Sequence, residues 1–128
     1  MTFSKMLLWV NCALFVAFGV GFVIAPEFLS KLITGAAPNA MNALTDMRAT
    51  YGGMALGIGV FFGLCARKSS FTYMGLMASW LVFSSIAVSR LIGIIVDGSP
   101  NVFMLILLVA ELLFVVLVSV AVKSIRNT

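Results

Sequence analysis

One apolar run near the end of the sequence contains a single charged residue: Val102-Phe-Met-Leu-Ile-Leu-Leu-Val-Ala-Glu111-Leu-Leu-Phe-Val-Val-Leu-Val-Ser-Val-Ala-Val122. A helix needs about 20 apolar residues to cross the roughly 30 Å hydrocarbon core of a bilayer, because each residue adds about 1.5 Å. This run is long enough, and Lys123 closes it. It therefore predicts a membrane-spanning helix.

Three further apolar runs precede this one. Of all residues, 62% are apolar and 9% are charged, and the mean hydropathy is +1.19. Soluble domains carry about 25% charged residues to hydrate their surface, so this chain must be solvated by lipid. The sequence predicts an all-α, polytopic membrane protein, a single domain (1–128) whose four-helix transmembrane bundle has helices at residues 6–25, 49–66, 71–96 and 102–122.

The longest connection follows the first run. Residues 26–34 place apolar and charged side chains at helical spacing, which is typical of a short amphipathic helix on the membrane surface. A break follows at Pro38, and Asn39 or Asn42 is a candidate cap for the second spanning helix. Residues 97–101 are expected to form a tight turn between the last two helices.

The charged residues predict one orientation in the membrane, because basic residues stay on the cytoplasmic side. We expect both termini in the cytoplasm and the long first loop outside. The first run is also too long for the apolar region of a signal peptide, so we expect it to be retained as a helix. The basic residues assigned to the cytoplasmic side are Lys5, Arg67, Lys68, Lys123 and Arg126.

Several function classes are disfavoured by composition. The chain has no histidine, which removes the usual haem and transition-metal ligands and the commonest general base, so we expect no metal and no cofactor. Cys12 and Cys65 lie in different runs and are interpreted as buried free thiols. The eight basic residues are scattered at the ends of runs and form no cluster, so nucleic acid is not an expected partner.

Arg90 and Glu111 are the most informative residues, because each costs about 2.5–3.5 kcal/mol near the bilayer centre. Counting from the outer helix ends, Arg90 lies about 9 Å deep and Glu111 about 13 Å deep. The short turn makes their helices neighbours. We therefore predict an Arg90–Glu111 ion pair.

More polar residues are expected at the same level. Asp97 follows Arg90 by two helical turns on one face, and Arg48 and Tyr51 open the second helix from the same side. The sequence predicts a polar pocket, open outward, in which Arg48, Tyr51, Arg90, Asp97 and Glu111 bind a ligand. The alternative is that these charges only specify how the helices pack.

Small and aromatic residues suggest how the helices pack in lipid, where small side chains allow close approach. The second helix carries Gly52, Gly53, Gly57, Gly59 and Gly63, which indicate tight packing within the chain or, alternatively, a dimer interface. Trp80 lies in mid-helix, and Ser84 is the candidate partner for its indole N–H. One stripe of the first helix is assigned to the core: Asn11, Phe15, Phe18 and Phe22.

The residues that carry a resemblance are Arg48-Ala-Thr-Tyr51-Gly52-Gly53, Arg90, Asp97-Gly98 and Glu111. With them the chain resembles small bacterial four-helix membrane proteins catalogued as a domain of unknown function. The resemblance spans nearly the whole chain. It implies a four-helix fold in the bacterial inner membrane and singles out the same polar residues, and it brings no established activity.

Four functions stay open. A module that binds or transports a small amphipathic or anionic lipophilic ligand is favoured, with the two arginines holding the anionic group and apolar walls holding the rest. A proton-coupled exporter using Glu111 is a second possibility. An enzyme is disfavoured, because two carboxylates and a tyrosine are a thin catalytic inventory. The last is an accessory subunit that packs against a larger membrane partner.

Overall fold

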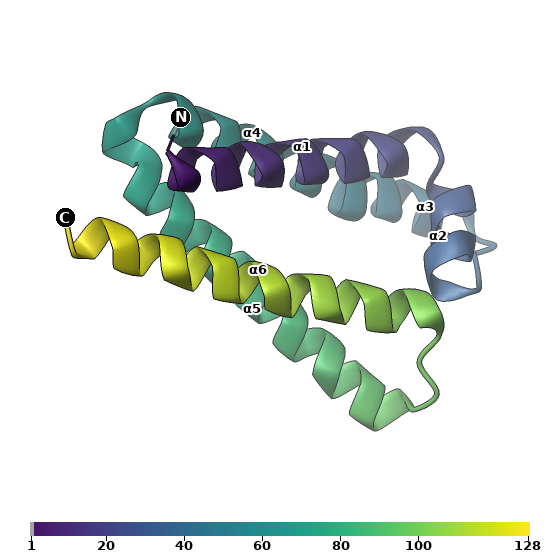
Figure 1. Cartoon of the computed structure of the whole chain (residues 1–128). Helices are drawn as coiled ribbons and strands as arrows, with labels where there is room; N and C mark the ends of the chain where they lie inside the picture. The colour runs from purple at the N-terminus through teal and green to yellow at the C-terminus, as the bar shows by residue number, and fades with distance from the viewer. Residues whose placement is uncertain (1) are drawn as a thin grey trace.

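Helices form nearly all of the structure, a computed structural model that describes residues 2–128 (Figure 1). Four helical stretches are long and apolar enough to cross a membrane, and residues 2–128 contain no strand, which confirms the predicted all-α membrane class. In chain order the elements are α1 (Phe3–Ile24), α2 (Pro26–Thr34), α3 (Met41–Met47), the π-helical segment η1 (Arg48–Met54), α4 (Ala55–Arg67), the 3-10 turn η2 (Ser69–Phe71), α5 (Thr72–Asp97) and α6 (Val102–Arg126).

The second spanning helix differs from its prediction. It runs from Met41 to Arg67 without a break, through α3, η1 and α4, and so begins eight residues before the predicted start at residue 49. Its N-cap is Ala40 with no side-chain hydrogen bond, so the capping role predicted for Asn39 or Asn42 is wrong. The apolar pattern missed this start because exposed polar residues such as Asp46 extend the helix beyond its apolar part.

The predicted amphipathic helix in the first loop is present as α2. Pro26 occupies its first turn, where a missing N–H costs no hydrogen bond, and Glu27 lies in the same turn. Gly35 ends it in the left-handed conformation with φ of 86° and donates its N–H to the carbonyl of Lys31. The buried hydroxyl of Ser30 donates to the carbonyl of Ala36 at 2.9 Å and holds the following loop against the helix.

The spanning helices are arranged as two pairs, α1 with η1 and α4, and α5 with α6 (Figure 1). Both chain termini lie at one end of the molecule, here called the terminal end, and the turns after α1 and α5 lie at the other, the loop end. The two pairs meet toward the terminal end through a cluster of fully buried apolar side chains: Leu8, Phe62, Leu76 and Val118.

The seam between α1 and the second spanning helix, here η1 and α4, is built from glycines. A Cβ atom at Gly59 would lie 2.9 Å from the backbone nitrogen of Val16, and one at Gly52 would lie 3.0 Å from that of Val23. A Cβ at Gly19 would meet the carbonyl oxygen of Gly52 at 2.8 Å. Backbones this close leave no room for a side chain, so dispersion contacts hold this pair together in lipid.

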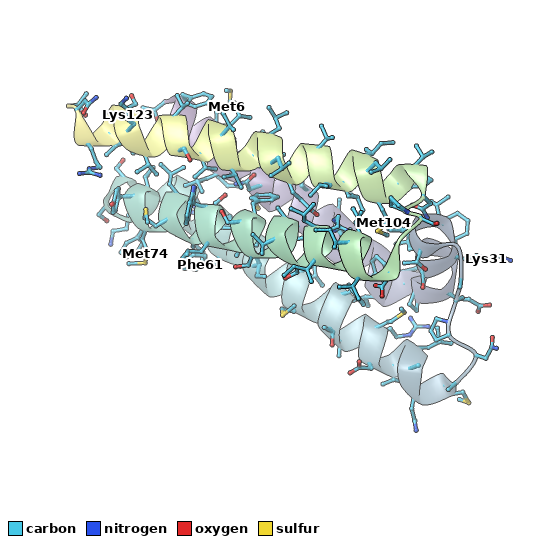
Figure 2. The ribbon with its side chains drawn as sticks, turned by 90° about the horizontal axis from the view of Figure 1, so that it is seen from below. Met6, Lys31, Phe61, Met74, Met104 and Lys123 are labelled. Carbon is cyan, nitrogen blue, oxygen red and sulfur yellow. The ribbon has the colours of Figure 1, made fainter. Side chains whose placement is uncertain are left out.

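The two pairs separate toward the loop end. Seen from below, the second spanning helix, whose loop-end part is α3 and η1, diverges from α5 as both approach that end (Figure 2). There the link between the pairs comes from α2, which contacts α6. Asn101 makes part of this link, because its Nδ2 donates to the carbonyl of Ile33 at 2.9 Å.

Candidate functional site

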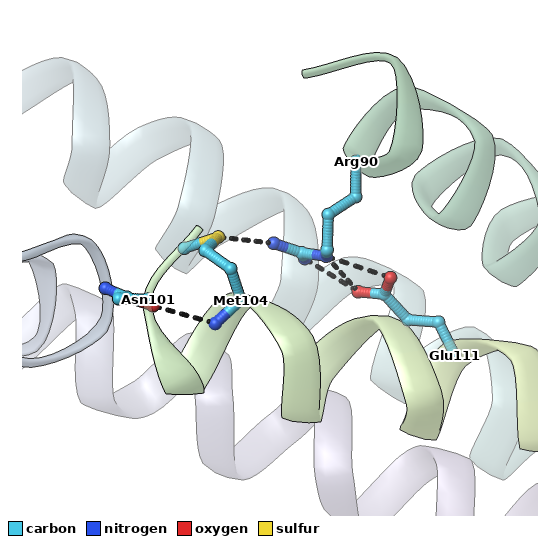
Figure 3. Close-up of polar contacts among 4 residues, drawn as sticks. All are labelled: Arg90, Asn101, Met104 and Glu111. Carbon is cyan, nitrogen blue, oxygen red and sulfur yellow. Dashed lines mark hydrogen bonds and ion pairs between the residues drawn. The ribbon is translucent and has the colours of Figure 1, made fainter. Parts of the chain in front are cut away.

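Arg90 on α5 and Glu111 on α6 form the predicted ion pair (Figure 3). The guanidinium Nη2 lies 2.7 Å from Oε1 of Glu111, and Nε lies 2.9 Å from Oε2 and 3.1 Å from Oε1. This fork-to-fork geometry is the strongest arrangement for a guanidinium and a carboxylate. It is also the one salt bridge among residues 2–128.

The pair is shielded but not sealed. The Glu111 side chain is 9% exposed and the Arg90 side chain 20% exposed. The remaining guanidinium nitrogen, Nη1, lies 3.2 Å from the thioether sulfur of Met104, which is a weak acceptor (Figure 3). One edge of Arg90 therefore has donor capacity that no strong acceptor in residues 2–128 uses.

A shallow depression also adjoins Arg90. Arg90, Ser85, Ser89 and Ile86, all on α5, line it. Ser85 and Ser89 are four residues apart and therefore share one face of the helix, where both are exposed. A cation flanked by two hydroxyls is a suitable arrangement of donors for an anionic oxygen.

Arg48 and Tyr51 contact the end of α1 and do not line the predicted pocket with Arg90. Arg48 donates from Nη1 to the carbonyl of Val23 and, at 3.4 Å, to that of Ile24. These carbonyls end α1 and have no partner within the helix, so the guanidinium caps it. The ring of Tyr51 lies 5.3 Å from that of Phe22, also on α1. Among residues 2–128, no polar contact joins either residue to the Arg90–Glu111 pair.

Asp97 also stays apart from that pair. It is the last residue of α5, it is exposed, and its Oδ2 lies back over Gly93 of the same helix. The structure thus brings together two of the five residues predicted to line one pocket. Arg48 and Tyr51 stay apart because they belong to η1, which packs against α1, and the two helix pairs diverge at the loop end. Asp97 stays apart because it lies at the exposed end of α5, two turns beyond Arg90.

Two packing predictions need correction. Gly52, Gly59 and Gly63 face α1 as expected, whereas Gly53 and Gly57 are exposed, with nothing closer than 3.9 Å to a Cβ at Gly53 and nothing within 4 Å at Gly57. The alternative role of Gly53 and Gly57 in a dimer interface stays a prediction.

The partner of Trp80 is Ser119 on α6, whose Oγ accepts from the indole Nε1 at 3.0 Å, and not Ser84. The prediction of Ser84, one turn away on α5, was wrong because the indole points across to α6. The stripe of the first helix is in the core at Asn11 and Phe22, whereas Phe18 is 38% exposed.

A family model matches residues 3–122, nearly the whole chain, and its description is "Domain of unknown function (DUF4345)". The chain belongs to the DUF4345 family. None of the curated proteins matches this DUF4345 chain, and none of the solved structures does.

Sequence reasoning missed two residues that organise this DUF4345 protein. Asn101 caps α6 by accepting from the backbone N–H of Met104 at 2.8 Å, while its amide holds α2. Its place immediately before an apolar run is a helix-start signal that could have been noticed. Gly19 forms the α1 side of the glycine seam, and a small residue inside an apolar run was the available signal.

The buried amide of Asn11 was assigned to the core without a partner. Its Nδ2 donates to the Oγ of Ser79 at 2.6 Å and ties α1 to α5, whereas its Oδ1 is buried with no partner among the described residues. Lipid offers no water to hydrogen-bond with a buried amide, so a hydrogen bond between helices takes the place of one to water. The contact therefore positions the two helix pairs relative to each other.

Proposed function

We propose that this protein is a membrane module that binds or moves a small anionic amphiphile, with the free edge of Arg90 as the anchor for its acidic group. The observation that carries the proposal is the guanidinium edge left without a strong acceptor beside an otherwise saturated ion pair. We place the protein in the bacterial inner membrane with both termini in the cytoplasm. The ligand then enters from the outer half of the bilayer.

The ion pair itself supports a binding role. Glu111 fixes the Arg90 side chain through three N–H···O contacts, so a ligand does not have to immobilise a flexible arginine. It also neutralises the guanidinium during membrane insertion, when an isolated charge is costly. A carboxylate or phosphate of the ligand takes the donors of Nη1, and Ser85 and Ser89 supply hydroxyls in the depression that Arg90 also lines.

The surroundings support an apolar tail on the ligand. Arg90 lies seven residues before the end of α5, about 10 Å below the loop end of that helix. At this level large apolar side chains of both helices are exposed, among them Leu91, Ile95 and Ile106. A ligand anchored at Arg90 therefore extends along apolar surface, as a lipophilic molecule requires.

Binding of a fluorescent fatty acid tests this proposal. The purified full-length protein in a zwitterionic detergent is titrated with 11-(dansylamino)undecanoic acid, whose emission rises when it leaves water. Laurate should displace the probe, and dodecanol at the same concentration should not, because dodecanol lacks the anionic group. Arg90→Gln should weaken binding about tenfold or more, the magnitude expected on losing one charge-assisted contact.

Two further variants complete the test. Lys31→Gln makes the same change of charge at an exposed residue of the loop end and should bind like the parent. Should Arg90→Gln lose its helical circular dichroism, Arg90→Lys retains the cation without the planar fork and should bind several-fold more weakly. Equal displacement by laurate and dodecanol, or parent-like binding by folded Arg90 variants, refutes the proposal.

A further inference from the structure

A second recess lies at the opposite end of the molecule, between the first part of α5 and the last part of α6, with a volume of about 640 Å³. Its lining combines three chemical kinds of side chain. Tyr73 and Trp80 supply aromatic rings from α5, Met77 and Val122 supply apolar surface, and Lys123 and Arg126 supply positive charge from α6. This recess shares no lining residue with the depression beside Arg90.

The floor of the recess is held in place by hydrogen bonds. The indole Nε1 of Trp80 donates to the Oγ of Ser119 at 3.0 Å, and that hydroxyl donates in turn to the carbonyl of Val115 at 2.7 Å. The indole therefore has a fixed orientation across the gap between α5 and α6. Its ring is nonetheless 37% exposed, so it is accessible to a molecule that lies in the recess.

The charge of the recess is uncompensated. Lys123 and Arg126 are three residues apart and share one face of the last turns of α6 (Figure 2 labels Lys123). None of the lining residues is acidic. The acidic residues of the chain are Glu27, Asp46, Asp97 and Glu111, which lie at the loop end or in the pair with Arg90.

We propose that this recess binds the phosphate headgroup of an anionic phospholipid from the leaflet at the terminal end. Lys123 and Arg126 contact the phosphate, and the hydroxyl of Tyr73, which is 45% exposed, lies at the same end. Met77, Val122 and the Trp80 ring contact the glycerol and the first part of the acyl chains. The site goes beyond the function proposed for Arg90, which it does not require.

The order of these groups along the helices favours a lipid over a free phosphate ion. Arg126 follows Ser119 by seven residues, so the cations lie up to about 10 Å closer to the membrane surface than the indole and its partner. Tyr73 and Trp80 are separated by the same distance on α5. Positive charge near the membrane surface with apolar surface deeper in the bilayer matches a lipid headgroup joined to its acyl chains. A free phosphate ion would contact the positive charges alone.

Quenching of Trp80 by brominated lipids tests this assignment. The chain has two tryptophans, so Trp9→Phe leaves Trp80 as the one fluorophore. The full-length protein is reconstituted in dioleoylphosphatidylcholine vesicles that contain either brominated phosphatidylglycerol or brominated phosphatidylcholine at equal mole fraction. Quenching should show an apparent affinity about fivefold higher for phosphatidylglycerol, the preference that one well-placed basic contact provides.

Matched variants separate a bound lipid from diffuse attraction. Lys123→Gln with Arg126→Gln should abolish the preference, and either single substitution should reduce it. Arg67→Gln with Lys68→Gln removes the same charge at the same end, outside the recess, and should leave the preference unchanged. Equal quenching by the two lipids in the parent refutes the proposal, as does an equal loss in both double variants. Abolition of the preference by glycerol 3-phosphate at constant ionic strength assigns the site to a soluble phosphate and also refutes it.

Discussion

Replacing Glu111 with leucine should cost this protein about 3 kcal/mol of stability, although leucine is more apolar and prefers both helix and lipid. The substitution removes the acceptor of three contacts and leaves the Arg90 guanidinium without a counter-charge. Removing one partner of a buried pair costs about 3–5 kcal/mol. Because the Arg90 side chain is 20% exposed, some hydration remains, and the lower end of that range applies.

The assay is reversible unfolding in mixed micelles with increasing dodecyl sulfate, followed by tryptophan fluorescence. A double-mutant cycle with Arg90→Met gives the coupling between the two residues. Each single variant should be destabilised by about 3 kcal/mol, whereas the double variant, with two apolar residues in place of the pair, should be close to the parent. If the two single effects add to within about 0.5 kcal/mol in the double variant, the residues are not coupled and the reasoning is wrong.

Three further predictions concern packing and capping. Gly59→Val should prevent the close approach of α1 and α4 and abolish the cooperative unfolding transition, whereas Gly57→Val, where a Cβ meets nothing within 4 Å, should unfold like the parent in the same micelle titration. Asn101→Ala removes the cap of α6 and the bond to α2, and should lower the unfolding free energy by about 1–2 kcal/mol. A loss below about 0.3 kcal/mol would contradict that capping role. Ser119→Ala should shift the Trp80 emission to shorter wavelength in the Trp9→Phe background, because the indole loses its hydrogen-bond partner, and an unchanged spectrum would contradict the contact.

Lipid as solvent explains why much of this fold was predictable from sequence. A spanning helix has to be apolar across the full thickness of the hydrocarbon core, so α1, α5 and α6 follow directly from the apolar runs. The Arg90–Glu111 pair was predictable for the same reason, since an unpaired charge at that depth is costly and the turn after α5 makes the two helices neighbours.

The arrangement of the helices was less predictable. Helical spacing shows which residues of the second spanning helix share a face, but it does not say which neighbouring helix that face meets. Arg48 was therefore predicted to lie with Arg90, whereas it caps α1. The π-helical segment Arg48–Met54 adds to the difficulty, because its wider turns alter the spacing on which such a face is counted. The prediction that Ser84 is the partner of Trp80 was wrong for a similar reason, because the reach of the indole to Ser119 depends on the distance between α5 and α6.

The uneven distribution of buried contacts between the helix pairs has a mechanical consequence. Each pair is joined along its own interface, whereas the two pairs share the apolar cluster around Phe62 near the terminal end, so a rotation of one pair against the other would pivot at that cluster. A lever of about 20 helical residues is about 30 Å long, so a rotation of about 5° moves its far tip by about 2.6 Å. At the loop end, where the second spanning helix and α5 are furthest apart, such a rotation is opposed by the contact of α2 with α6 and by the hydrogen bond from Asn101 to Ile33.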